Sequence, residues 1–161
     1  MRIALINENS QADKNPIIFK ELEEVSKTYS YEAVNIGMFN KEDRPLTSVQ
    51  NGILAAILLN TKAVDFVING CGTGEGALLA MNSFPGVLCG YVTEPSDAYL
   101  FRQVNDGNAI SMPFAKGFGW GAELNLRYTF EKLFSTKGGE GYPKERVIPE
   151  QRNKKILDKV K

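Results

Sequence analysis

A glycine-rich stretch in the middle of the chain carries several residue types that could do chemistry. Residues 69–76 read Asn-Gly-Cys-Gly-Thr-Gly-Glu-Gly, after an apolar run and before a helix-like run. Glycines at alternate positions leave the backbone bare where a strand gives way to a helix, so several N–H groups can point at one anion. Because the stretch also holds the thiol of Cys71, the hydroxyl of Thr73 and the carboxylate of Glu75, it predicts an active site.

Nucleotide binding also uses glycine-rich turns, but it fits this stretch poorly. No Gly-Lys-Ser or Gly-Lys-Thr follows the glycines, so the phosphate-loop signature is missing. The dinucleotide signature belongs after the first strand, whereas this stretch follows the third expected strand, and Glu94 is only loosely placed as its acidic residue. A nucleotide-binding, flavodoxin-like sheet is therefore disfavoured.

The composition limits both the chemistry and the partners. The 161 residues include no histidine, which excludes Ser-His and Cys-His nucleophile pairs and most zinc sites. Nineteen basic and nineteen acidic residues cancel, which argues against a nucleic-acid binder or a membrane-surface binder. No apolar run approaches the roughly 20 residues of a membrane span. Two cysteines, Cys71 and Cys89, offer no disulfide framework, which favours a reducing cytoplasm.

Alternating strands and helices must position the glycine-rich stretch. Strands are expected at 2–7, 31–36, 64–68, 87–91 and 108–112, and helices at 15–29, 48–60, 77–83, 95–104, 116–134 and 149–161. This alternation predicts an α/β fold: a Rossmann-like, doubly wound, parallel five-stranded sheet in three αβα layers, with a C-terminal extension helix. Ligands bind at the carboxyl ends of such strands, so Glu8 and Asn9 are expected to face Cys71 across one crevice.

The chain is short enough for one main domain. Residues 1–135 are expected to form the Rossmann-like domain, and residues 136–161 the C-terminal extension, which begins with the glycine-rich linker 136–141. The extension is short and polar, so its helix would be marginal by itself. It is therefore expected to pack on a neighbouring subunit.

Several short motifs follow one another in an order that resembles a known enzyme family. They are Gly70-Cys71-Gly72-Thr73-Gly74, Phe84-Pro85-Gly86-Val87, Glu94-Pro95-Ser96-Asp97-Ala98, Arg102-Gln103-x-Asn105-Asp106-x-Asn108 and Arg146-Val147. The family is that of ribose-5-phosphate isomerase B and galactose-6-phosphate isomerase. The resemblance implies an aldose–ketose isomerase of a small phosphorylated sugar, working through an enediolate without metal or other cofactor, as a homodimer or homotetramer.

Two residues compete for the role of the base. The resemblance implies Cys71, which most relatives share, or Glu75, whose position carries the base in a branch that lacks the cysteine. A helix N-terminus can lower the pKa of a thiol, which favours Cys71. Glu75 is ionised without help, and it could equally be a helix N-terminal charge. We favour Cys71 as the base, with Glu75 close behind.

The resemblance assigns substrate contacts to other residues of the same motifs. Thr73 would orient substrate oxygens, with loop capping as the alternative, and the amides of Gly72, Gly74 and Gly76 would hold the oxyanion, with turn geometry as the alternative. Asn105 matches an active-site asparagine that is often contributed by the neighbouring subunit. A helix C-cap is the other interpretation of Asn105, because a glycine follows two residues later.

The chain departs from the family pattern where the family binds phosphate and opens the sugar ring. The family's Asp-His after the first strand is here Glu8-Asn9; Glu8 can still accept a sugar hydroxyl, but Asn9 cannot carry a histidine's charge. The position of the ring-opening histidine holds Val104, so we expect either a substrate that is already open-chain or a sugar ring that is opened by another group. Arg44 replaces the tyrosine of the family's Asp-Tyr-Pro and adds a cation to the crevice. Of the two phosphate-binding arginines, only Arg146 remains.

These departures leave two functions open. The leading hypothesis is an isomerase of a small sugar phosphate, favoured by Cys71, Thr73 and Glu75 together. The alternative is a non-catalytic sugar-phosphate-binding or partner subunit of the same family, favoured by Val104 and Asn9.

Overall fold

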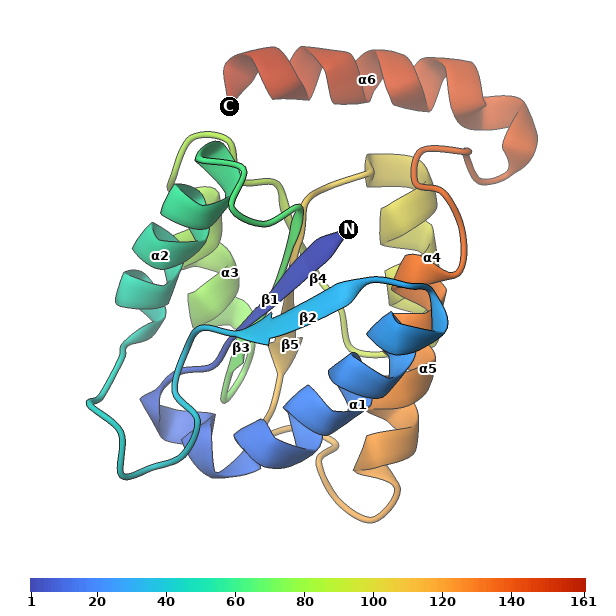
Figure 1. Cartoon of the computed structure of the whole chain (residues 1–161). Helices are drawn as coiled ribbons and strands as arrows, with labels where there is room; N and C mark the ends of the chain where they lie inside the picture. The colour runs from blue at the N-terminus through green and yellow to red at the C-terminus, as the bar shows by residue number, and fades with distance from the viewer.

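A five-stranded parallel sheet forms the centre of the protein, as the computed structural model of residues 1–161 shows (Figure 1). Its strands lie in the order β2-β1-β3-β5-β4, and all four pairings are parallel. They are β1 (Arg2–Ile6), β2 (Glu32–Asn35), β3 (Phe66–Cys71), β4 (Cys89–Tyr91) and β5 (Ala109–Pro113). The predicted doubly wound fold is confirmed, and most strand limits lie within two residues of those expected.

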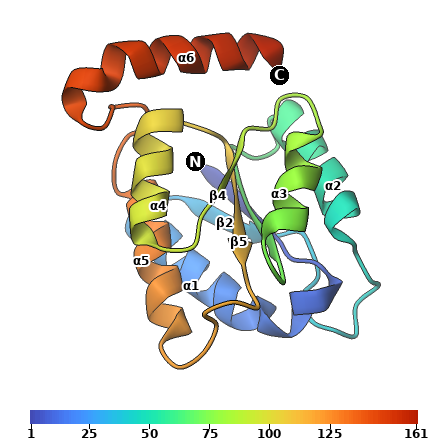
Figure 2. The same ribbon diagram turned by 180° about the vertical axis from the view of Figure 1, so that it is seen from behind.

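Helices cover both faces of the sheet. Figures 1 and 2 show α1 (Asn15–Thr28), α4 (Pro95–Leu100) and α5 (Ala122–Phe134) over one face, and α2 (Ser48–Asn60) and α3 (Glu75–Asn82) over the other. Side chains alternate along β1, so Ile3 and Leu5 belong to the first hydrophobic core, and Ala4 and Ile6 to the second. The inner strands β1, β3 and β5 are buried along nearly their whole length, which explains why they are the more apolar ones.

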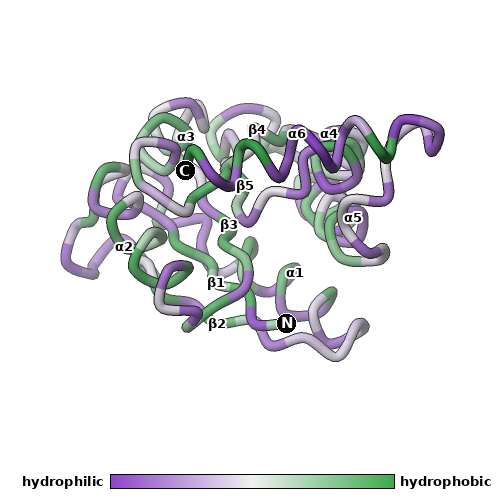
Figure 3. The backbone as a smooth tube through the Cα atoms, turned by 90° about the horizontal axis from the view of Figure 1, so that it is seen from above, coloured by the Kyte–Doolittle hydropathy of each residue, from purple (hydrophilic) through white to green (hydrophobic).

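Shorter helical segments connect these elements. They are η1 (Asn9–Lys14), the π-helical η2 (Phe101–Asn105) that continues α4, and η3 (Lys144–Arg146) just before the terminal helix α6 (Val147–Val160). α6 crosses the amino-terminal end of the sheet, opposite the carboxyl ends of the strands (Figure 1). Viewed from above, α6 is largely hydrophilic with scattered apolar residues (Figure 3), and Ile148 and Val160 are exposed.

One predicted helix is wrong at its start. The helix expected from residue 116 begins only at Ala122, because Gly117 and Gly121 adopt left-handed φ values of +65° and +84°. Residues 114–121 therefore form a loop at the carboxyl end of β5. By contrast, α2 has the limits that were predicted, since Thr47 and Gln50 form a capping box at its N-terminus. No helix of the protein is both long and apolar enough to cross a membrane.

Candidate active site

The glycine-rich stretch forms the turn from β3 into α3. Gly74 caps α3 in the left-handed conformation, with φ of +80°, and its N–H donates to Cys71 Sγ at 3.2 Å. The Gly74 carbonyl accepts from Ser111 Oγ at 2.5 Å, and the Thr73 carbonyl accepts from Tyr91 Oη at 2.9 Å. Neighbouring elements therefore hold the turn in place from the side of β4 and β5.

The glycines of the turn serve two different purposes. A Cβ on Gly70 would lie 2.4 Å from the Phe114 ring, and one on Gly74 would lie 2.7 Å from the Tyr91 ring and 2.9 Å from backbone atoms of β5. Close packing therefore demands glycine at these two positions. A Cβ on Gly72 or Gly76 would have no neighbour closer than 3.6 Å or 3.8 Å, respectively, so the chain leaves room above both.

Several backbone N–H groups in this turn have no partner within the protein. The N–H of Gly74 binds the Cys71 sulfur and that of Glu75 binds Thr73 Oγ1, but the N–H groups of Gly72, Thr73 and Gly76 make no hydrogen bond. The turn from a strand into a helix supplies such orphan donors. Together they can stabilise a negative charge on an oxygen placed above the turn.

The two candidate bases lie at the two ends of the turn: Cys71 ends β3 and Glu75 begins α3. Cys71 is buried, with 8% of its surface exposed, and its sulfur lies 3.8 Å from the position of a Cβ on Gly76. Glu75 is exposed in the first turn of α3 and forms no ion pair with any side chain. The geometry thus fixes the thiol against the turn and leaves the carboxylate free to move.

The segment after β1 faces the same turn, as expected. The register pairs Ile6 with Asn69, which places Glu8 level with Cys71 at the ends of adjacent strands. Glu8 is 3% exposed, and its carboxylate accepts from Ser10 N at 3.0 Å and from Ser10 Oγ at 2.5 Å. Asn9 is exposed, and its backbone N–H donates to the Leu46 carbonyl.

Arg44 lies in the exposed loop between β2 and α2 and forms no ion pair. Two other predicted substrate ligands lie at the far end of the sheet from the glycine turn. Asn105 ends η2, a few residues before β5 begins, and Arg146 ends η3, directly before α6. The helix α6 crosses the amino-terminal end of the sheet (Figure 1). Within one chain the structure does not bring them to the turn. Contact with the turn would require a second subunit.

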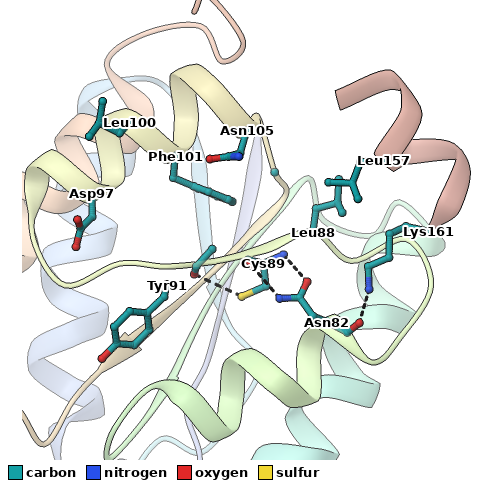
Figure 4. A pocket seen from close by; sticks show the side chains of 12 residues that line it. Asn82, Leu88, Cys89, Tyr91, Asp97, Leu100, Phe101, Asn105, Leu157 and Lys161 are labelled. Carbon is teal, nitrogen blue, oxygen red and sulfur yellow. Dashed lines mark hydrogen bonds between the residues drawn. The ribbon is translucent and has the colours of Figure 1, made fainter. Parts of the chain in front are cut away.

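A cavity of about 580 Å³ opens along the edge strand β4, between η2 and α6 (Figure 4). Asn82 exchanges hydrogen bonds of 2.9 Å and 3.0 Å with the backbone of Cys89, and Lys161 Nζ donates to the Asn82 carbonyl. Burial raises the pKa of the Cys89 thiol, and the charge of Lys161 lowers it by less. Cys89 therefore lines this cavity as a neutral thiol. It does not suit the role of base that is expected of Cys71.

Three side chains that the sequence analysis did not identify lie beside the glycine turn. Ser48 Oγ lies 4.0 Å from the position of a Cβ on Gly76, and Gln11 Nε2 and Ser10 Oγ lie 3.6 Å and 3.9 Å from one on Gly72. Only the adjacency of β1 and β3 could have indicated Gln11 and Ser10, because both follow β1. No group of three or more Cys, Asp or Glu side chains is arranged to hold a metal ion.

The parallel αβα fold places a glycine turn, a thiol and a carboxylate at the carboxyl edge of the sheet, and comparison with known proteins shows the family. Residues 3–149 match the family described as Ribose/Galactose Isomerase, so the chain belongs to the ribose/galactose isomerase family. It is accordingly an enzyme, an intramolecular oxidoreductase that isomerises sugars. None of the curated proteins compared with the chain matches it.

Several solved structures resemble this chain in both sequence and fold. A 4-deoxy-L-threo-5-hexosulose-uronate ketol-isomerase, crystallised with a tartrate, is 66% identical with a TM-score of 0.97, over 99% of this chain and 76% of that one. A ribose-5-phosphate isomerase from Vibrio parahaemolyticus is 57% identical with a TM-score of 0.97, over the same shares. The type B ribose 5-phosphate isomerase of Trypanosoma brucei, at 18% identity and a TM-score of 0.82 over 99% and 98%, shares the fold.

Proposed function

We propose that the protein interconverts the aldose and ketose forms of an open-chain acidic sugar through an enediolate bound at residues 70–76. The observation that carries this proposal is the set of free N–H groups on Gly72, Thr73 and Gly76, next to a thiol and a carboxylate. Loss of one hydrogen-bond donor to a developing oxyanion typically lowers turnover by a factor of about 10²–10³. A binding protein would have little use for a base at this place.

The proposed reaction is a proton transfer between adjacent carbons. Cys71 as thiolate, or Glu75 as carboxylate, removes the proton from the carbon next to the substrate carbonyl. The electron pair moves to the carbonyl oxygen, where the free N–H groups stabilise the charge, and the hydroxyl of Thr73 orients the neighbouring oxygen. The base then returns the proton to the former carbonyl carbon. The proton of the adjacent hydroxyl passes to the former carbonyl oxygen, so that this oxygen becomes a hydroxyl and the adjacent carbon becomes the new carbonyl.

Two residues favour an open-chain substrate with a carboxylate. Val104 stands where the family's ring-opening histidine would be, and Asn9 replaces the phosphate-binding histidine. A 5-hexosulose uronate has a ketone at carbon 5, so it lacks the hydroxyl that closes a six-membered ring. The uronate named for the 66% identical structure is therefore an open-chain acid, the kind of substrate that Val104 and Asn9 favour.

A sugar phosphate is the second candidate substrate. It is favoured by Arg146 with the nearby Lys144, and by the ribose-5-phosphate isomerase that is 57% identical. Both residues lie far from the glycine turn of their own chain, so a phosphate site would need the neighbouring subunit. We infer a homodimer or larger assembly in which α6 and Asn105 approach a neighbour's turn.

A substrate panel tests the proposal. The purified protein would be incubated with 4-deoxy-L-threo-5-hexosulose uronate, with the open-chain erythrose 4-phosphate and with cyclic ribose 5-phosphate, and the products identified by NMR. Turnover of an open-chain acid, with the uronate fastest and ribose 5-phosphate slowest, is the expected result. No turnover of any of the three, together with binding seen by thermal shift, would favour a non-catalytic partner subunit instead.

A further inference from the structure

A chain of hydrogen bonds runs along the wall of the crevice that faces Gly72. Lys14 Nζ donates to Gln11 Oε1 at 2.6 Å, Gln11 Nε2 donates to Ser10 Oγ at 3.3 Å, and Ser10 Oγ donates to Glu8 Oε1 at 2.5 Å. Each donor in this chain determines the orientation of the next group. The buried carboxylate of Glu8 thus stands at one end and an ammonium group at the other.

Lys14 fixes the orientation of the Gln11 amide. An ammonium group can only donate, so the end of the amide that it contacts must be the carbonyl oxygen. The amide NH₂ must then be the end that faces Gly72, at 3.6 Å from the position of a Cβ there. One of its two N–H groups goes to Ser10, and the other makes no hydrogen bond within the chain.

Lys14 is itself held by the loop that follows β5. Its Nζ also donates to the Phe114 carbonyl at 2.5 Å and lies 4.9 Å from the centre of the Phe118 ring. The loop is thereby tied to η1, whose last residue is Lys14. Gln11 is 9% exposed, so its amide has little freedom to turn away.

We propose that Gln11 is a substrate-binding residue that determines specificity, and that Lys14 is its positioning residue. This assignment rests on the proposed function and deepens it. The Cys71 sulfur lies at the other part of the turn, 3.2 Å from Gly74 N. A substrate whose reacting carbons lie at the thiol therefore presents its remote oxygens, a carboxylate or a chain hydroxyl, to the free N–H of Gln11.

Gln11→Glu isolates this donor, because it keeps the oxygen that Lys14 contacts and replaces the NH₂ by a second oxygen. With the open-chain uronate as substrate, KM is expected to rise about tenfold to a hundredfold, with turnover within about threefold of the wild type. Lys14→Met is expected to raise KM by a smaller factor, and Lys14→Arg to restore it. Lys116→Met is the matched control, because Lys116 is exposed and makes no hydrogen bond through its side chain.

A binding measurement keeps the assignment testable without turnover. Calorimetric titration with tartrate, a small open-chain hydroxy acid, is expected to show about tenfold weaker binding to Gln11→Glu than to the wild type. Active wild type with an unchanged KM and unchanged tartrate affinity in Gln11→Glu would overturn the role of Gln11 and leave the proposed function standing. An inactive wild type that binds tartrate through Gln11 would overturn the proposed function alone. If Gln11→Glu and Lys14→Met both lowered turnover, raised KM and lowered the thermal stability to the same extent, the two residues would only support the fold. That result would also overturn the assignment.

Discussion

Replacement of Gly74 by alanine is the most informative perturbation of the glycine turn. Gly74 has a φ of +80°, so any side chain there is strained by the left-handed backbone. The new Cβ would also lie 2.7 Å from Tyr91 Cε2 and 2.9 Å from Met112 C and Pro113 N, atoms of the sheet that cannot easily move. The two penalties have different origins and can be separated by a matched control.

The magnitude follows from adding the two effects. A left-handed backbone costs a non-glycine residue about 1–2 kcal/mol, and overpacking against a fixed neighbour adds about 1–3 kcal/mol. Gly74→Ala should therefore lower the free energy of unfolding by about 2–5 kcal/mol. Gly121→Ala is the control, because Gly121 has a φ of +84° but no atom within 4 Å of its would-be Cβ. It should lose only about 1–2 kcal/mol.

Urea denaturation followed by circular dichroism measures both losses, and steady-state kinetics follow the activity. Because the Gly74 N–H contacts the Cys71 sulfur, turnover of Gly74→Ala should fall about tenfold or more, while Gly121→Ala should keep turnover within about twofold. The reasoning is refuted if Gly74→Ala is no less stable than Gly121→Ala, or if it keeps full turnover.

Further variants test other parts of the structure. Val104→His should bring measurable turnover of cyclic ribose 5-phosphate; equal wild-type rates on cyclic and open-chain sugars would contradict the role given to Val104. Truncation after Ser135 should weaken both assembly and affinity for an acidic sugar, and light scattering that showed a fully active 17.8 kDa monomer would exclude the shared site. Arg127→Ala should lower the urea denaturation midpoint, because it leaves the buried carboxylate of Glu21 without its 2.7 Å ion pair. Arg127→Lys is its control, and an unchanged denaturation midpoint in Arg127→Ala would be the contrary result.

The sequence predicted those features that depend on neighbours along the chain. The capping box of Thr47 and Gln50 set the start of α2, and the apolar runs marked strands that are buried on both faces. The glycines between β3 and α3 placed the turn, because a run of alternate glycines suits neither the end of a strand nor the interior of a helix. Glu8 was placed correctly because β1 and β3, whose carboxyl ends carry Glu8 and Cys71, are adjacent in the sheet.

Features that depend on distant contacts could not be predicted. The Gln11 amide is oriented by Lys14, which is held in turn by the Phe114 carbonyl 100 residues away. No local pattern reveals such a contact. The late start of α5 was missed because the expected helix was extended back to residue 116 across three glycines, whereas the left-handed backbone at Gly117 and Gly121 prevents a helix there.

The central claim is that the turn carries a base, and the turnover of two variants tests it most directly. Cys71→Ala and Glu75→Gln would be assayed with a saturating open-chain acid, after their thermal unfolding has shown that both are folded. The account predicts that at least one of them, Cys71→Ala first, loses about a hundredfold or more of its turnover with little change in KM. Wild-type turnover in both variants would contradict it, because the turn would then bind the substrate without taking its proton.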